Sequence, residues 1–168
     1  MGKLKLSGVI RESIVDGPGI RFVIFTQGCP HHCKGCHNPD THDPNGGYET
    51  DSEKIIDAIK NTPIISGVTF SGGEPFEQAD ELSIIAEKVH EFGLNVLTYT
   101  GYTMEYILSR LNKNPDWEAL LRNSDILIDG PFILKKRSLE LRFRGSTNQR
   151  ILSPIESLKS GCAVKKEL

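Results

Sequence analysis

The sequence predicts an α/β protein built on an open, mainly parallel β-sheet of about four βα units. Short runs of β-branched and aromatic residues alternate with longer stretches of helical hydrophobic period. Units in this order imply right-handed βαβ crossovers. With 168 residues, the chain is shorter than the ~250 of a closed eight-stranded barrel. We therefore expect one domain, residues 1–168, forming an open, partial (βα) barrel with its core at about 13–131.

Four segments are expected to form the parallel strands. Each is apolar and ends at turn-forming residues: 20–27, 67–71, 94–99 and 125–129. In an open α/β sheet, ligands bind beyond the carboxyl ends of the strands. The segments that follow these strands should therefore share one rim: the loop after Gln27, Gly72-Gly73-Glu74, Thr100-Gly101 and Asp129-Gly130.

Helices are expected between these strands. Thr50 to Glu53 has the form of a capping box, which predicts a helix to about Asn61. A second helix is expected over 78–92, with Gly93 as its C′ residue. The side chains expected to face the core in this helix are Leu82, Ile85, Val89 and Phe92.

Two shorter helices are expected before the last strand. Thr103 is a favourable N-cap for the first of them, and Pro115 is favourable at the start of the second. Trp117 in the second helix is expected to lie in the core rather than to serve as a platform for a ligand.

Three cysteines lie within eight residues: Cys29, Cys33 and Cys36, spaced C-x3-C-x2-C. Four thiolates complete a [4Fe–4S] cluster, one for each iron. Three thiolates leave one iron without a protein ligand, and an open coordination position is where a metal site performs chemistry. The loop that holds them, 28–50, is long and rich in glycine and proline, which also indicates function. The spacing therefore predicts a catalytic cluster that binds another molecule at its fourth iron.

The same loop allows other interpretations. The three cysteines and one histidine would make a Cys3His zinc site. The histidines available are His31, His32, His37 and His42. Cys33 to His37 also matches the C-x-x-C-H string of c-type haem attachment, but that chemistry belongs to exported proteins, and the N-terminus has no secretory h-region. Cys162 lies far from the loop and is expected to be a free thiol.

Gly72-Gly73-Glu74 is expected beside the cysteine loop, one βα unit later. Two glycines let a backbone approach a ligand closely. Glu74 or nearby carbonyl groups can accept hydrogen bonds from a ligand ammonium group. Together with an open iron, this arrangement suits an amino acid that chelates the metal through its amine and carboxylate.

Charge is distributed unevenly along the chain. Residues 132–168 hold nine basic and three acidic side chains, a net charge of +6, against −2 for the whole chain. This segment is either a solvated basic surface or a docking surface for an acidic partner. Nucleic acid is not an expected partner, because aromatic residues are not interleaved with these charges.

No apolar run approaches the ~18 residues of a membrane span, and clustered cysteines without a leader predict a reducing, cytoplasmic location.

Together these motifs resemble the radical S-adenosylmethionine (radical SAM) superfamily. Its cysteine triad is matched by Cys29, Cys33 and Cys36, and its GGE motif by Gly72 to Glu74. The stretch 13–21 is similar to the Asp-Gly-Pro-Gly-x-Arg segment of the activating proteins of glycyl radical enzymes. Within that group, five segments resemble the proteins that activate anaerobic ribonucleoside-triphosphate reductase: 25–29, 36–39, 70–76, 129–132 and 141–150.

The resemblance implies a partial barrel of the radical SAM type and a [4Fe–4S] cluster held by the three cysteines. S-adenosylmethionine (SAM) would bind the open iron, and no catalytic residue beyond the cluster ligands is implied. The residues expected along SAM are Gly35, Cys36 and His37 near the adenine and Gly72, Gly73 and Glu74 near the ammonium group. Many superfamily members have an aromatic residue where this chain has Gly35, so His37 is the candidate to cover the adenine.

The resemblance also implies a reaction and its partners. Flavodoxin or ferredoxin would reduce the cluster, and the 5′-deoxyadenosyl radical formed from SAM would take hydrogen from a glycine of the reductase. Residues 16–21 and the basic stretch 135–150 are expected to contact the reductase, although Arg142 and Arg144 could instead form ion pairs within the domain. Two other functions stay open: activation of a different glycyl radical enzyme, such as pyruvate formate-lyase, and a non-catalytic zinc-binding module.

Overall fold

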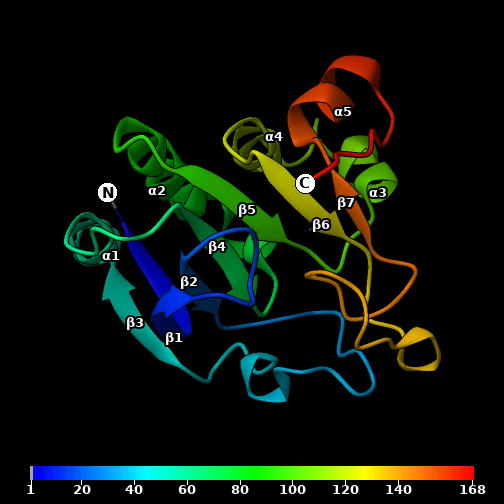
Figure 1. Ribbon diagram of the computed structural model, residues 1–168, viewed down its shortest axis with the longest axis horizontal. Helices are drawn as coiled ribbons and strands as arrows, with labels where there is room; N and C mark the ends of the chain where they lie inside the picture. Colours follow the sequence, from blue (N-terminus) through cyan, green and yellow to red (C-terminus); the bar gives the residue numbers. More distant parts are fainter. Residues whose placement is uncertain (1) are drawn as a thin grey trace.

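The computed structural model describes residues 2–168 and is built on one seven-stranded sheet, in the order β3-β1-β2-β4-β5-β6-β7 (Figure 1). Four consecutive strands of this sheet are parallel. They are β2 (Arg21–Thr26), β4 (Gly67–Gly72), β5 (Asn95–Tyr99) and β6 (Ile126–Asp129). The sheet does not close, so the open, mainly parallel architecture and all four predicted strands are confirmed.

Three antiparallel strands that flank the parallel ones were not predicted from the sequence: β1 (Lys3–Ser13), β3 (Tyr48–Asp51) and β7 (Arg150–Leu152). β1 pairs with both β2 and β3, and its register with β2 shifts at two places. These irregularities interrupt the alternation of apolar and polar residues that marks a strand in a sequence. β3 lies in the segment expected to be loop, and β7 has only three residues.

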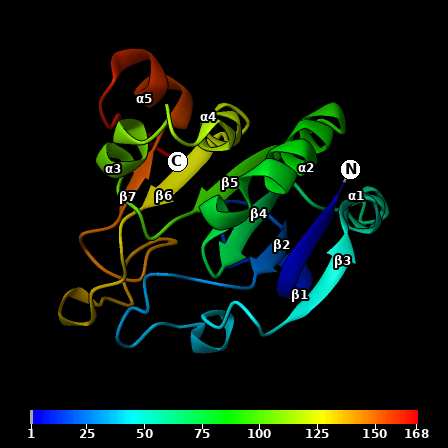
Figure 2. The same ribbon diagram turned by 180° about the vertical axis from the view of Figure 1, so that it is seen from behind.

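The helices follow the predicted order. They are α1 (Ser52–Lys60), α2 (Ala79–Glu91), α3 (Met104–Ser109), α4 (Pro115–Arg122) and α5 (Pro154–Ser160), the last of which was not predicted. Seen from behind, α2 crosses β4 and β5 (Figure 2). Thr103 caps α3 by accepting a hydrogen bond from the Tyr106 amide, and Gly93 follows α2 with φ = +76°, both as predicted. No helix in residues 2–168 is long and apolar enough to cross a bilayer.

Two details of the predicted helices are wrong. The N-cap of α1 is Asp51, whose side chain makes no capping hydrogen bond, so there is no capping box. Contacts with distant segments hold this end instead: the Ser52 amide donates to the Gly2 carbonyl, and the Ser52 hydroxyl donates to Glu81. Phe92 lies beyond the end of α2 and is 37% exposed.

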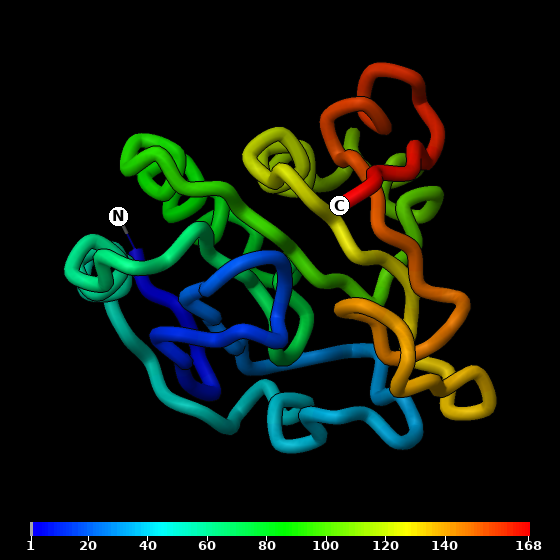
Figure 3. Tube along the Cα trace, in the orientation of Figure 1, coloured from blue at the N-terminus to red at the C-terminus, as the bar shows by residue number. Residues whose placement is uncertain are grey.

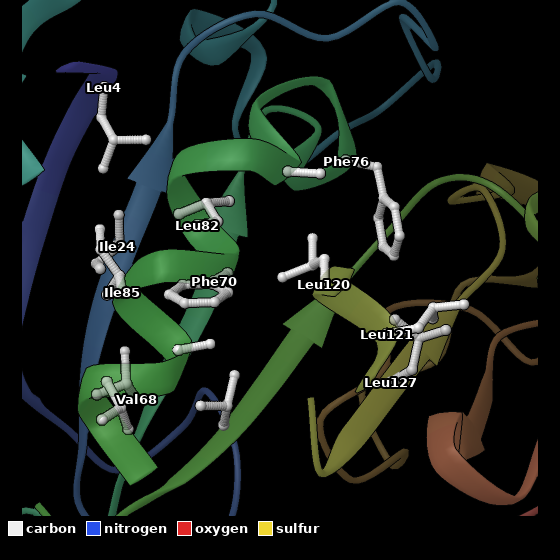
Figure 4. Close-up of a cluster of buried hydrophobic side chains, with 14 of the residues drawn as sticks. Leu4, Ile24, Val68, Phe70, Phe76, Leu82, Ile85, Leu120, Leu121 and Leu127 are labelled. Atoms are coloured by element: carbon white, nitrogen blue, oxygen red, sulfur yellow. The ribbon is translucent and has the colours of Figure 1, made fainter. Parts of the chain in front are cut away.

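The main core lies between the sheet and its helices (Figure 4). Side chains from six strands and four helices meet there, including Leu4, Ile24, Val68, Phe70, Leu82, Ile85, Leu120 and Leu127. Each fully buried side chain of this size contributes about 1.5–3 kcal/mol of transfer free energy. Trp117 is also buried and meets Phe76 edge to face, with 5.6 Å between ring centroids, which confirms its place in the core. This packed layer supports the sheet from the side opposite to the loops.

Loops cover that opposite face (Figure 3). The β1–β2 connection passes in front of the sheet, and the long β6–β7 connection lies beside the cysteine loop. Arg21 holds the first of these loops. Its guanidinium is fully buried and donates to Thr69 Oγ1 (2.7 Å) and to the carbonyls of Pro18 (3.0 Å) and Val68 (2.9 Å). Burial lowers the pKa of Arg21 to about 10. Arg21 is therefore internal, and the prediction that it contacts a partner is wrong.

Candidate functional site

A cavity of about 390 Å³ lies at the carboxyl ends of the parallel strands. All four segments predicted to share this rim contribute to its lining: the cysteine loop, Gly72-Gly73, Thr100-Gly101 and Gly130. Residues from the two covering loops complete the wall, namely Val15, Asp16, Phe132, Leu141, Phe143 and Arg144. The structure therefore brings together segments that are up to about a hundred residues apart in the sequence.

Cys29, Cys33 and Cys36 all line this cavity as half-buried free thiols. The Cys36 amide donates to the Cys33 carbonyl (3.1 Å), and the Asn38 amide donates to Cys36 Sγ (3.4 Å). Burial raises the pKa of the Cys29 thiol to about 11. This thiol is therefore protonated at neutral pH, and binding to iron has to release its proton.

The glycine pair joins the end of β4 to the start of the cysteine loop. The Gly73 amide donates to the Thr26 carbonyl, and the Glu74 amide donates to the Gly28 carbonyl, both at 2.8 Å. A Cβ atom on Gly73 would collide with the Gly28 carbonyl oxygen, and Gly72 has φ = +93°. Only glycine fits both positions without strain. The pair therefore sets the position of the loop that carries the cysteines.

Glu74 is fully buried and does not line the cavity. Its carboxylate accepts hydrogen bonds from His31 Nε2 (2.7 Å), Thr100 Oγ1 (2.9 Å), the Gly101 amide (2.7 Å) and the Phe76 amide (3.0 Å). Protein donors from the cysteine loop, from η2 (Pro75–Gln78) and from the β5–α3 turn thus occupy both oxygens. The side chain therefore links three parts of the rim instead of facing a ligand in the cavity.

Gly35 and His37 meet the β6–β7 connection. Gly35 has φ = +76°, and a Cβ atom there would lie 2.8 Å from Leu134 Cδ1. The His37 ring is 5.2 Å from the Phe132 ring, tilted by 50°. Phe132 itself lines the cavity. It ends the motif segment 129–132, to which the sequence analysis gave no role, and it supplies an aromatic wall near Gly35.

Tyr99 and Phe143 form a second feature that the motifs did not reveal. The Tyr99 hydroxyl donates to the Phe143 carbonyl (2.6 Å), and both residues line the cavity. Burial raises the pKa of Tyr99, so this hydroxyl keeps its proton. Phe143 has φ = +62°, a strained conformation for a bulky residue that surrounding contacts must maintain. Tyr99 thus connects the sheet to the strained part of the β6–β7 connection.

Comparison with known proteins agrees with this geometry. Residues 15–152 match the family model described as "4Fe-4S single cluster domain". The anaerobic ribonucleoside-triphosphate reductase-activating protein of Vibrio cholerae is 35% identical over 147 residues, which cover 82% of this chain and 90% of that protein. The protein of the same name from Escherichia coli K12 is 28% identical over 144 residues, with 81% and 90% coverage. This chain belongs to the family of anaerobic ribonucleoside-triphosphate reductase-activating proteins.

Two further likenesses lie outside this family. The pyruvate formate-lyase-activating enzyme of Clostridium pasteurianum is 36% identical over 130 residues, which cover 74% of this chain and 50% of that enzyme. Among solved structures, QueE from Escherichia coli is similar with a TM-score of 0.48 and 18% identity, over 60% of this chain and 53% of QueE.

The site of this activating-protein family member fits a [4Fe–4S] cluster by its donor set. Three free thiols face one cavity, and the amide that donates to Cys36 Sγ is the kind of hydrogen bond that tunes cluster sulfurs. In residues 2–168, no three His, Cys, Asp or Glu side chains are gathered as they would be around a single metal ion. A [4Fe–4S] cluster does not need its ligands gathered around one ion, because each of the three thiolates binds a separate iron.

The four histidines near the cysteines have other contacts. His31 is hydrogen-bonded to Glu74, His32 and His42 meet edge to face at 5.1 Å, and His37 lies against Phe132. Cys162 is exposed just after α5. Among the hydrogen bonds of residues 2–168, its sulfur makes one, to the Ser160 hydroxyl at 3.7 Å. It is a free surface thiol, as predicted.

Replacing Tyr99 by phenylalanine is expected to loosen the β6–β7 connection. The substitution removes the hydroxyl that fixes the strained Phe143, at a cost of about 1 kcal/mol in the free energy of unfolding. Amide hydrogen exchange should become faster in 138–149 and remain unchanged in α2. Equal protection of 138–149 in both proteins would contradict the role given to Tyr99.

Proposed function

We propose that this chain uses a [4Fe–4S] cluster and SAM to install a glycyl radical on an anaerobic ribonucleoside-triphosphate reductase. The observation that carries the proposal is the single cavity shared by Cys29, Cys33, Cys36 and the Gly72-Gly73 pair. When bound, the cluster supplies the electron that splits SAM into methionine and a 5′-deoxyadenosyl radical, which takes a hydrogen atom from a glycine of the reductase. The cofactor performs the difficult chemistry, and the protein orients and shields it.

Different residues in and around the cavity are proposed to bind different parts of SAM. The backbone carbonyl groups of Gly72 and Gly73 are the proposed acceptors for the SAM ammonium group. Glu74 acts indirectly, because its carboxylate holds His31 and the Gly101 amide in place. Along the adenine, we propose Gly35, Cys36 and His37, with the Phe132 ring beside them.

The reductase is proposed to approach between the two covering loops. Ile14 and Val15 are 76% and 72% exposed, although both are apolar, and Val15 reaches the wall of the cavity. Exposed apolar side chains beside a cavity are typical of a protein interaction site. Asp16 from the same loop and Arg144 from the β6–β7 connection also line the cavity, where a glycine-bearing loop of the partner would enter.

Reversing the charges with Arg142→Glu and Arg144→Glu is expected to weaken the complex with the reductase without loss of the cluster. Neither guanidinium forms an ion pair in residues 2–168: Arg142 lies over the Phe143 ring at 4.9 Å, and Arg144 donates only to backbone carbonyls. Rim charges chiefly affect association rates and the dependence on salt. Calorimetric titration should show weaker binding of the reductase at equal iron content, and an unchanged affinity would exclude these arginines from the interface.

A second candidate function is activation of pyruvate formate-lyase, which the 36% identity to the Clostridium pasteurianum enzyme favours. Capture of partners from an anaerobic extract, followed by mass spectrometry, distinguishes the two targets. In either case we propose flavodoxin or ferredoxin as the electron donor. A cytoplasmic location is also proposed, because the site needs reduced thiols.

Anaerobic reconstitution with iron, sulfide, reductant and SAM tests the proposed function. The reduced protein should give a paramagnetic signal that changes when SAM is added, and 5′-deoxyadenosine should accumulate. A colourless protein that carries zinc, or a cluster signal that SAM leaves unchanged, would contradict the proposal. Addition of the reductase should then produce the signal of a glycyl radical.

A further inference from the structure

Four exposed cationic side chains near the cysteine loop form no ion pair in residues 2–168: Lys34, Lys135, Lys136 and Arg137. Other basic residues do pair with carboxylates, for example Lys3 with Glu49 at 3.3 Å and Arg150 with Asp129 at 2.6 Å. An unneutralised cationic group of this kind creates a local positive potential on a chain whose net charge is −2.

These cations are close together because the β6–β7 connection packs on the cysteine loop. Lys135 and Lys136 belong to η3 (Leu134–Lys136), and Arg137 follows it. Leu134 Cδ1 lies 2.8 Å from the position of a Cβ atom on Gly35, which directly follows Lys34. Figures 1 and 3 show the β6–β7 connection beside the loop that follows β2. We call Lys34, Leu134, Lys135, Lys136 and Arg137 the cationic patch.

The cationic patch lies outside the reaction cavity. None of its five residues lines that cavity, whereas Arg144 from the same connection does. Leu134 is 39% exposed and gives the patch an apolar centre. A protein on this patch and a protein at the mouth of the cavity would therefore contact different residues.

We propose that the cationic patch docks the electron donor, a small one-electron carrier protein with acidic side chains around its redox centre. The inference rests on the proposed function, which requires an electron from outside. In this step the donor loses one electron and the cluster gains it, so that no bond forms or breaks and no proton moves.

Two structural reasons favour this entry point. SAM and the reductase glycine must occupy the cavity, so the electron has to arrive at the cluster from another side. Gly35 is exposed, has no side chain and does not itself line the cavity, so the backbone next to the cluster ligand Cys36 is open on the outer side of the loop. An acidic carrier held over Gly35 would bring its redox centre close to that ligand, and complementary charge would raise the association rate.

The charge reversals Lys135→Glu and Lys136→Glu, combined in one protein, test the inference. Lys54→Glu and Lys60→Glu form the matched control, because they make the same charge change on exposed positions of α1, across the sheet from η3 (Figure 1). Stopped-flow absorption follows reduction of the cluster by reduced flavodoxin, the probe protein, at low and high salt. We expect the patch variant to react roughly tenfold more slowly at low salt, and the control to react like the wild type.

A second measurement does not depend on activity or on a variant. Carbodiimide joins wild-type lysines to flavodoxin carboxylates in contact with them, and mass spectrometry should find Lys34, Lys135 or Lys136 in the linked peptides. Equal rates for the patch variant and the wild type, equal slowing of both variants, or linkage only at other lysines would overturn the docking site.

Reduction by dithionite shows whether the docking site alone is wrong or whether the proposed function is wrong as well. This small reductant needs no docking surface, so it should reduce the cluster and drive SAM cleavage equally in the wild type and the patch variant. If dithionite supports SAM cleavage while flavodoxin ignores the patch, only the docking site is wrong. If dithionite produces no SAM cleavage in the wild type, the proposed function and the docking site both fail.

Discussion

Replacing Cys36 by alanine is expected to abolish cluster assembly and SAM cleavage while the fold is retained. The thiol is one of three that line the cavity, so its loss leaves two irons without a protein ligand. We expect SAM cleavage to fall by more than about 100-fold, since even residues that only support metal ligands cost 10–100-fold. The side chain is half-buried in a loop outside the main core, so thermal unfolding should change little.

Cys162→Ala is the matched control for this substitution. It removes the same chemical group from an exposed position at the end of α5, away from the cavity. Iron and sulfide should be present at the wild-type level in the Cys162 variant and absent from the Cys36 variant, with equal circular dichroism. Retention of a SAM-responsive cluster after loss of Cys36 would show that another residue is the third ligand.

The sequence was sufficient to predict the parallel half of the fold. β2, β4, β5 and β6 are each buried on both faces, so their apolar runs are strong local patterns, and a glycine ends each strand or follows it within two residues. Parallel strands place their carboxyl ends on one edge, and the shared rim of the site follows from that geometry alone. For the same reason the order of strands and loops along the chain is enough to predict that the cysteine loop and the glycine pair lie together.

The roles of Arg21, Glu74 and Tyr99 could not be predicted in the same way. Charged and polar side chains are usually solvated, and sequence alone gives no indication that Arg21 or Glu74 is fully buried. Their burial depends on hydrogen-bond partners 48 and 27 residues away in the chain, Thr69 and Gly101. Tyr99 meets a carbonyl group 44 residues away. Such pairings exist only once the loops have folded over the sheet.

Replacing Glu74 by glutamine is expected to have the largest effect on the rim. Each carboxylate oxygen accepts from a backbone amide, Gly101 at one and Phe76 at the other, so the NH2 group of glutamine would face an N–H donor in either orientation. The loss of charge-assisted hydrogen bonds at a fully buried site costs roughly 2–4 kcal/mol in the free energy of unfolding. For a chain of this length, that corresponds to a fall of about 5–15 °C in Tm.

Glu87→Gln makes the same chemical change at an exposed position of α2 and should leave Tm unchanged. A test of positioning uses the cluster-loaded variants well below their Tm, where both are folded. Because Glu74 fixes His31 and the Gly101 amide, its loss should weaken SAM binding and alter the change that SAM produces in the paramagnetic signal. If the Glu74 variant has a lower Tm but binds SAM as tightly as the Glu87 variant, the carboxylate stabilises the fold without orienting the site. If Tm is also unchanged, the buried hydrogen-bond network does not exist in solution as described.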